Sequence, residues 1–230
     1  MTGTVVNAAA IVAGALLGII LRKGIPDPVK NTVMQGVGLS VLLIGAQMSL
    51  KTQNVLVVVI SLVAGGIIGE VINIEKRLVA LGFLLEKKMG GGEGKLARAF
   101  VTTSLIYCVG AMAILGSIED GLTGNPSTLY AKSMLDGISA VIFSSTMGIG
   151  VIFSAVPVFL YQGSITLMAD SMKSLFTDAV IRELTATGGL LIAGIGINLL
   201  EIKEIKVGNL LPSIAVVTLL SWAVQKYGPF

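Results

Sequence analysis

Residues 3–21 read GTVVNAAAIVAGALLGIIL, a run of nineteen positions without a charged side chain, and Arg22 and Lys23 follow it directly. A helix that crosses the hydrocarbon core of a bilayer needs about 20 mainly apolar residues, so this run predicts a membrane span. Hydrophobic residues make up 54% of the 230-residue chain and charged residues 13%, with a mean hydropathy of +0.91. A soluble domain carries about 25% charged residues. We therefore expect an all-α, polytopic integral membrane protein.

Similar runs recur along the chain and predict about eight transmembrane helices, at residues 3–21, 31–50, 54–72, 97–116, 126–153, 157–173, 184–200 and 208–226. Residues 133–169 hold one charge, Asp136, over a length that suits two crossings. Gly148, Gly150 and Pro157 mark a break inside this stretch. It forms either two crossings or a re-entrant hairpin, which gives seven or eight spans and leaves the rest of the topology unchanged.

Basic residues indicate the orientation, because loops on the cytoplasmic side of a membrane are enriched in Lys and Arg. With the N-terminus outside, eleven basic residues lie on the inner side: Arg22, Lys23, Lys30, Lys76, Arg77, Lys87, Lys88, Lys95, Arg98, Lys203 and Lys206. Five lie on the outer side: Lys51, Lys132, Lys173, Arg182 and Lys226. We therefore expect both termini outside.

Residues 73–96 form the largest predicted cytoplasmic element. Apolar residues recur at helical spacing within it, and charged residues take the other positions. This pattern is typical of a helix that lies in the membrane interface. Gly90-Gly91-Gly92 predicts a flexible segment after it. The predicted domains are a three-helix repeat at 1–72, this linker at 73–96, a second three-helix repeat at 97–183 and a C-terminal helix pair at 184–230.

The two predicted repeats share an order of features. Each has the end of a span, an Asp or Asn before Pro, a Lys, and a polar residue before Gly. In the first repeat these features are 17–20, Asp27-Pro28, Lys30 and Gln35-Gly36. In the second repeat they are 115–118, Asn125-Pro126, Lys132 and Asp136-Gly137. Asp or Asn before Pro favours the start of a helix. Because three spans is an odd number, the second copy is inverted in the membrane. Inverted 3+3 repeats of this kind enclose the substrate site of many secondary transporters.

Polar residues deep in the predicted spans are the candidates for a substrate or ion site, because an ionisable group in hydrocarbon costs about 2.5–3.5 kcal/mol. At 1.5 Å per residue from the predicted helix starts, Asp136 lies roughly 16 Å and Gln35 roughly 12 Å along its helix. The predicted site residues are Asp136, Gln35, Gln162, Ser144, Ser145, Tyr161 and Glu70. Glu70 and Asn7 are expected nearer to span ends, where Glu70 suits an interfacial role equally well.

No Lys or Arg is expected deep enough in the spans to neutralise Asp136. A carboxyl group in that position is protonated, hydrogen-bonded to neutral partners such as Gln35, or bound to a mobile cation. This asymmetry favours a path for a cation or a proton over a path for an anion. The alternative interpretation of Asp136 is a structural hydrogen bond between helices.

The chain has no histidine and one cysteine, Cys108, which excludes Ser-His-Asp triads, H-E-x-x-H zinc sites and disulfides within the chain. It also lacks a second deep aspartate for a two-carboxylate protease. We expect no enzyme, no catalytic residue and no cofactor, while a metal site stays undetermined. The net charge of +3 does not indicate nucleic acid as a partner. The expected partners are the lipid bilayer and a small solute or cation, and self-association is left open.

Several strings resemble the YdfK/YqgA family of bacterial inner-membrane proteins, a domain-of-unknown-function family. They are CVGAMAILGSIEDG at 108–121, KSMLDG at 132–137, YQG at 161–163, GGLLI at 188–192 and GINLL at 196–200. Members commonly carry Pro where Ala111 stands here. The resemblance covers nearly the whole chain and implies a protein of the bacterial plasma membrane, without implying a substrate. The repeat and the polar residues favour a transporter or channel, and a structural, assembly or lipid-handling protein is the alternative.

Overall fold

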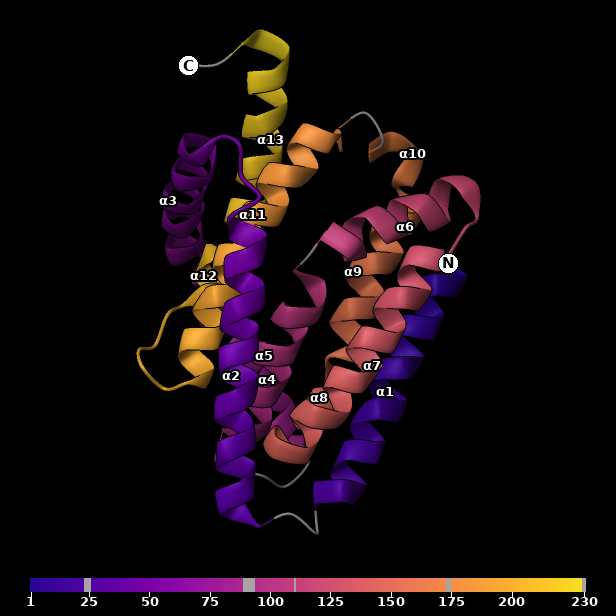
Figure 1. Cartoon of the computed structure of the whole chain (residues 1–230), viewed down its shortest axis with the longest axis vertical. Helices are drawn as coiled ribbons and strands as arrows, with labels where there is room; N and C mark the ends of the chain where they lie inside the picture. The colour runs from indigo at the N-terminus through magenta and orange to yellow at the C-terminus, as the bar shows by residue number, and fades with distance from the viewer. Residues whose placement is uncertain (23–25, 89–93, 110, 173–174, 229–230) are drawn as a thin grey trace. The chain divides into compact units, whose positions relative to one another are not determined.

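The computed structural model describes residues 1–22, 26–88, 94–109, 111–172 and 175–228. Every regular element in these ranges is an α-helix, as the sequence predicts. The helices are α1 (Thr2–Arg22), α2 (Asp27–Ser49), α3 (Val55–Ile72), α4 (Ile74–Lys88), α5 (Lys95–Cys108), α6 (Ala111–Thr123), α7 (Ser127–Met147), α8 (Gly150–Phe153), α9 (Ala155–Leu167), α10 (Ala169–Met172), α11 (Asp178–Leu199), α12 (Val207–Leu210) and α13 (Pro212–Tyr227) (Figure 1).

Six stretches among the described residues are long and apolar enough to cross a membrane: 2–22, 31–49, 55–72, 150–167, 178–199 and 207–227. The predicted span 97–116 is instead a bent pair of helices, α5 and α6, whose axes differ by 59°. Helix α7 is 21 residues long but carries Lys132 and Asp136. Six of the predicted spans therefore have a counterpart, with 157–173 displaced to 150–167, while the count of seven or eight stays a prediction. The bend at α5–α6 is a feature that the sequence pattern missed.

The chain forms two compact units. Unit 1 contains Met1–Met34 and Leu78–Ser171, and unit 2 contains Gln35–Arg77 and Met172–Phe230. These units group the helices differently from the four predicted domains, which rest on sequence order and on the proposed repeat.

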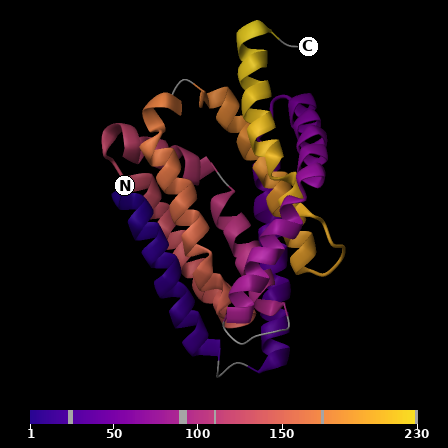
Figure 2. The ribbon, with the colours of Figure 1, turned by 180° about the vertical axis from the view of Figure 1, so that it is seen from behind.

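The closest packing in unit 1 joins α1 to α7, which run parallel and side by side (Figures 1 and 2). Glycines permit this approach. A Cβ atom at Gly14 would lie 2.1 Å from the carbonyl oxygen of Gly137, and one at Gly18 would lie 2.2 Å from that of Val141. Small residues of this kind let membrane helices pack backbone to backbone. Helix α9 contacts α1 in the antiparallel direction, so that Asn7 lies beside Gln162.

Unit 2 is also built on glycine contacts. Helix α3 packs on α12 and α13, and a Cβ atom at Gly65 would lie 2.3 Å from the amide nitrogen of Ser213. The described part of α2 in this unit packs on α11, where a Cβ atom at Gly45 would lie 2.4 Å from the amide nitrogen of Ala193. The abundance of glycine in the sequence therefore has a packing role in both units.

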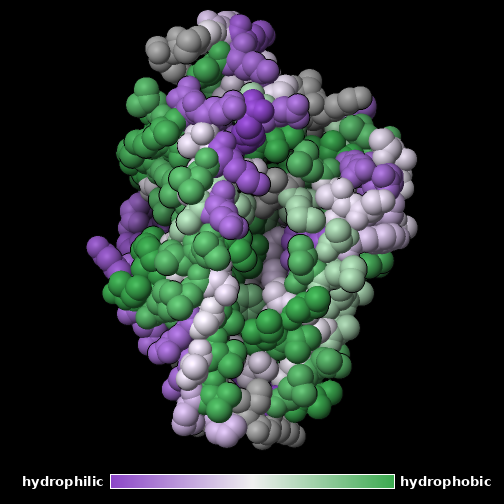
Figure 3. All heavy atoms as spheres, viewed as in Figure 1, coloured by the Kyte–Doolittle hydropathy of each residue, from purple (hydrophilic) through white to green (hydrophobic). Residues whose placement is uncertain are grey.

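Large apolar side chains remain exposed on these helices. Leu16, Leu17 and Ile20 of α1 are at least half exposed, as are Val63, Ile67 and Val71 of α3. Apolar side chains cover much of the face shown in Figure 3. Lipid is the solvent that suits such surfaces, since exposed apolar patches of this extent are rare on soluble monomers.

The predicted local signals have clear counterparts. Helix α7 ends before Gly148, whose φ of 92° belongs to the left-handed region that favours glycine. Asn125 accepts a hydrogen bond from the Ser127 amide at the start of α7. The helix predicted within 73–96 is α4, which follows α3 after one left-handed residue, Asn73. Its place at the membrane interface stays a prediction. Gly90-Gly91-Gly92 and Lys23 lie outside the described residues.

Candidate functional site

A buried polar network in unit 1 surrounds Asp136, the residue that the sequence singles out. Asp136 is 7% exposed. One of its carboxylate oxygens, Oδ2, accepts hydrogen bonds from the Lys132 ammonium at 2.5 Å and from Asn7 Nδ2 at 3.0 Å. Asn7 Nδ2 also donates to Gln162 Oε1 at 3.2 Å. The network thus joins α1, α7 and α9, and it contains two of the predicted site residues, Asp136 and Gln162.

Lys132 corrects the sequence-based expectation for Asp136. The expectation was that no basic residue lies deep enough to neutralise the carboxylate, and Lys132 was counted among the outer basic residues. The structure buries the Lys132 side chain to 9% exposure and pairs it with Asp136 one helical turn later. The i, i+4 spacing on a helix brings such side chains together, so the signal was present in the sequence. Asp136 therefore has an internal counter-ion.

Asn7 is a second residue whose role the sequence concealed. Its position suggested a place near a span end, but its side chain is fully buried between Asp136 and Gln162. Two polar atoms of this pair, Asn7 Oδ1 and Gln162 Nε2, are buried without a hydrogen-bond partner. A buried polar group left unpaired costs about 1–3 kcal/mol. One acceptor and one donor therefore remain available for a water molecule or a polar ligand.

Polar contacts extend the network toward the N-terminal end of α1. Thr4 Oγ1 lies 3.5 Å from Thr166 Oγ1. The Asp120 carboxylate accepts a hydrogen bond from the Gly3 amide at 3.2 Å. Both contacts join α1 to elements far along the chain, so the start of α1 is held by polar groups on α6 and α9.

The predicted hydroxyl residues do not reach Asp136 in the hydrogen bonds observed. Ser144 donates to the carbonyl oxygen of Ala15 at 2.8 Å, which joins α7 to α1. Ser145 donates to the carbonyl oxygen of Ile142 in its own helix, as serines in membrane helices commonly do. Tyr161 is half-buried beside Gln162 on α9. Of the three residues, Ser144 therefore makes a contact between helices, from α7 to α1.

Gln35 and Glu70, the remaining predicted site residues, belong to unit 2. The Gln35 side chain is exposed on α2. Glu70 lies near the end of α3 and accepts hydrogen bonds from Lys206 at 2.8 Å and from Asn209 at 2.6 Å. The hydrogen bond that Lys206 donates to Glu70 raises the pKa of Lys206 above its ordinary value. Glu70 thus takes part in a polar contact at the end of its span.

Glu75 belongs to the same corner of unit 2. Its carboxylate accepts a hydrogen bond from the Gly208 amide, and its own amide donates to Asn209 Oδ1 at 2.7 Å. Burial raises the pKa of Glu75 above its ordinary value of 4.5. The contacts of Glu70 and Glu75 fasten the junction of α3 and α4 to α12.

Among the described residues, no group of three or more His, Cys, Asp or Glu side chains is arranged to hold a metal ion. The chemistry of the unit 1 network is that of ion pairing and hydrogen bonding. Its charged groups form the Lys132–Asp136 ion pair, and its amides carry the unpartnered atoms Asn7 Oδ1 and Gln162 Nε2.

Comparison with known proteins establishes the family. Residues 2–222 match the family model described as "Protein of unknown function (DUF554)". The chain belongs to this family. It is 34% identical to "Uncharacterized membrane protein YdfK" of Bacillus subtilis (strain 168), over 99% of each chain. It is 29% identical to "Uncharacterized protein YqgA" of Escherichia coli (strain K12), over 96% of each chain.

The resemblance inferred from the sequence strings is therefore confirmed. No solved structure matches the chain. The relative from Bacillus subtilis is described as a membrane protein, and this agrees with the long apolar helices of the present chain, which is a helical membrane protein.

Proposed function

We propose that the chain is a membrane transporter or channel for a small solute or cation, and that the network of Lys132, Asp136, Asn7 and Gln162 lies on its path. The observation that carries the proposal is the buried Lys132–Asp136 ion pair within a bundle of apolar helices. Ionisable groups are rare inside membrane spans, and they commonly mark ion pathways and proton relays. The unpartnered atoms Asn7 Oδ1 and Gln162 Nε2 supply further polar contacts beside the pair.

A proton is the cation that suits this site best. The groups that bind Asp136 Oδ2 are both donors, the Lys132 ammonium and the Asn7 amide. A metal cation at Asp136 would add a second positive charge beside the ammonium, whereas a proton can pass from the Lys132 ammonium to the Asp136 carboxylate without adding charge to the apolar bundle. Protonation of Asp136 removes the charge that holds Lys132, which frees α7 side chains to change partners.

The proposed architecture has eight spans with an inverted 3+3 repeat and a C-terminal pair, in a bacterial plasma membrane with both termini outside. Helices α1 and α7 are each 21 residues long and run parallel. Two parallel spans require an odd number of crossings between them. Helices α2 and α3 and the bent α5–α6 pair supply three, which supports counting the bent pair as one span and α7 as another.

Purified protein in liposomes tests the transport proposal. We expect proton flux under an imposed membrane potential, read with a trapped pH-sensitive dye, and uptake of a solute from a pooled panel. The double variant Lys132→Gln/Asp136→Asn, which keeps the site polar and neutral, should lose this flux. Asp170→Asn removes an exposed carboxylate of the same unit and is the matched control. Liposomes as tight as protein-free ones, or a double variant with wild-type flux, would contradict the proposal.

A structural, assembly or lipid-handling role is the second candidate. The same ion pair also favours this role, because Lys132 and Asp136 neutralise each other within α7 and then need no mobile ion. The glycine contacts of α1 with α7 would then serve packing alone. Under this role the double variant should fold and leave membrane permeability unchanged. Neither candidate involves catalysis.

A further inference from the structure

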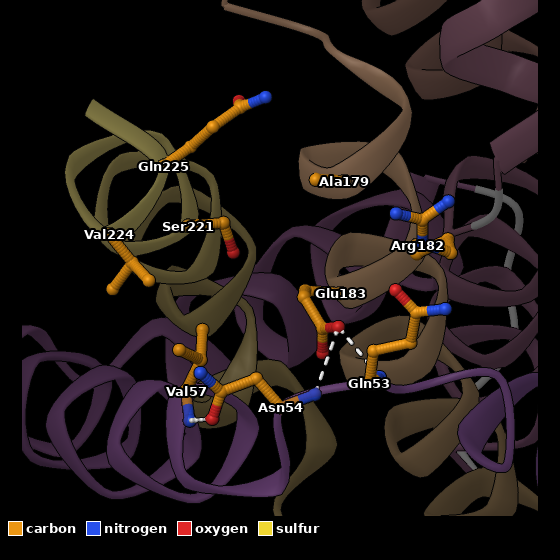
Figure 4. A pocket seen from close by; sticks show the side chains of 9 residues that line it. All are labelled: Gln53, Asn54, Val57, Ala179, Arg182, Glu183, Ser221, Val224 and Gln225. Carbon is orange, nitrogen blue, oxygen red and sulfur yellow. Dashed lines mark hydrogen bonds between the residues drawn. The ribbon is translucent and has the colours of Figure 1, made fainter. Parts of the chain in front are cut away.

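Unit 2 contains a cavity of about 210 Å³ whose lining shares no residue with the network around Asp136. It lies where α3 and α11 begin and α13 ends, which places it at the ends of three candidate spans (Figure 4). Its lining residues are Gln53, Asn54, Val57, Ala179, Arg182, Glu183, Ser221, Val224 and Gln225. A cavity at span ends is within reach of the aqueous phase.

The cavity contains an unsatisfied hydroxyl group. Ser221 is 6% exposed, and its Oγ atom has no hydrogen-bond partner. In Figure 4 this hydroxyl lies on the side of α13 that faces Glu183. Unpaired buried polar groups are uncommon in native proteins, so this one indicates a water molecule or a ligand in the cavity.

The acidic group of the lining is already used by the protein. The Glu183 carboxylate accepts hydrogen bonds from Thr52 Oγ1 at 2.5 Å, from the backbone amide of Gln53 at 2.8 Å and from the backbone amide of Asn54 at 3.2 Å. These bonds fix the connection between α2 and α3. Because the Glu183 carboxylate already accepts three hydrogen bonds, we expect it to be a weak acceptor for a hydrogen bond from a ligand.

The remaining polar groups of the lining are mainly donors. Asn54 Oδ1 accepts from the Val57 amide at 3.3 Å, and Gln225 Oε1 accepts from Thr177 at 2.8 Å. Each of these two oxygens already has one donor, whereas the amide nitrogens of the same side chains act only as donors. Arg182, the basic residue of the lining, is exposed and adds a planar set of donors.

We propose that this cavity binds a small monocarboxylate from solution. A carboxylate accepts in the plane that an Arg side chain offers, and Ser221 and the amides donate to its remaining lone pairs. Val57, Ala179 and Val224 supply apolar wall for a short alkyl group. One basic residue beside Glu183 disfavours a dianion. The volume is below the roughly 300–1,000 Å³ of drug-sized sites, which limits the ligand to a few carbon atoms.

Thermal unfolding of the full-length protein in detergent tests this site with formate, acetate and propionate at constant ionic strength. Each salt is compared with its neutral amide, formamide, acetamide or propionamide, which has nearly the same shape. We expect the carboxylates to raise the melting temperature with saturation and the amides to leave it unchanged. Arg182→Gln should weaken the apparent affinity roughly tenfold or more, since it removes charge-assisted hydrogen bonds.

Lys203→Gln is the matched control, because it removes an exposed positive charge from unit 2 outside the lining. Equal effects of carboxylate and amide, no effect of any carboxylate, or equal affinities in Arg182→Gln and Lys203→Gln would overturn the proposal. Ser221→Ala should also weaken binding. Nanodiscs with and without phosphatidylserine identify the source of the carboxylate. We expect the propionate effect in both, and its loss with phosphatidylserine would overturn assignment to a free solute.

Discussion

Lys132 and Asp136 illustrate how one contact changes the meaning of a residue. A carboxylate without a counter-ion in a membrane span can bind a mobile cation, whereas a carboxylate beside an ammonium group is already part of an ion pair. The two side chains are nearly buried, at 9% and 10% exposure. Breaking a buried pair leaves an uncompensated charge and costs about 3–5 kcal/mol, but removing both partners costs much less.

A double-mutant cycle on this pair follows from that asymmetry. We expect Asp136→Asn and Lys132→Gln each to lower the free energy of unfolding by up to about 5 kcal/mol. The double variant should lose less stability than either single variant. Apparent melting temperatures of the four proteins in detergent measure the coupling. Additive losses would show that the two charges do not stabilise each other.

The site residues were predictable to different degrees, and the reasons are physical. Asp136 and Gln162 stand out because polar groups are costly in an apolar run. Asn7 was underestimated, because distance from a predicted span end says nothing about which helices lie beside it. Its partners are 129 and 155 residues away in the sequence. Contacts over such separations depend on tertiary packing, which periodicity in a single run does not encode.

At the scale of the element, the glycines on α1 determine how close α7 can come. A Cβ atom at Gly14 would meet the Gly137 carbonyl oxygen, whereas one at Gly36 on α2 would meet nothing within 4 Å. We expect Gly14→Ala to destabilise the protein by about 1–3 kcal/mol through overpacking. Gly36→Ala should be neutral or stabilise by about 0.5–1 kcal/mol, because alanine favours the helix.

Melting temperatures of these two variants provide the check, with Gly36→Ala as the matched control for the same added methyl group. A Gly14→Ala protein as stable as the wild type would mean that α1 and α7 do not pack as closely as the structure shows.

The corner between α3 and α4 predicts a pH dependence. Burial raises the pKa of Glu75 above 4.5, so the folded protein holds this proton to higher pH than the unfolded chain does. The contribution of Glu75 to the stability of the folded protein is therefore greatest below pH 4.5. It is lost as the pH rises through the pKa of Glu75 in the folded protein. We expect the stability gain of Glu75→Gln over the wild type to grow between pH 4.5 and neutrality.

Melting curves across that pH range measure the difference, and Asp178→Asn, on an exposed carboxylate of unit 2, is the control. A constant difference between Glu75→Gln and the wild type over the whole range would contradict the prediction.

The elements also show which local signals determine structure. Gly148 ends α7 because its backbone adopts a positive φ, and Asn125 bonds the first turn of the same helix. Both signals are local and were readable in the sequence. The 59° bend between α5 and α6 was not, since Ala111 gives no proline signal and the flanking residues form one continuous apolar run.

For the whole molecule, the orientation in the membrane is the prediction with the widest consequences. The bias of eleven basic residues against five was counted with Lys132 on the outer side. Without Lys132, which is buried in α7, the count is eleven against four, and the orientation stays a prediction.

Cysteine accessibility tests this orientation in a protein carrying Cys108→Ala. We expect Lys88→Cys to be protected from an impermeant maleimide in intact cells and Ser171→Cys to be labelled. Both positions are exposed in the structure, so burial within the fold does not account for a difference between them. Labelling of residue 88 from outside, with protection of residue 171, would reverse the topology.

The parallel contact between α1 and α7 has a consequence for how the protein is made. Residues 23–126 are synthesised after α1 and before α7. Asn7 therefore enters the bilayer long before Asp136 and Gln162 exist to receive its hydrogen bonds. During that interval α1 waits in the membrane with its amide unsatisfied and its glycine face uncovered. Because its hydrogen-bond partners lie 129 and 155 residues later in the chain, α1 is inserted before α7 and α9 and reaches its final packing only after them.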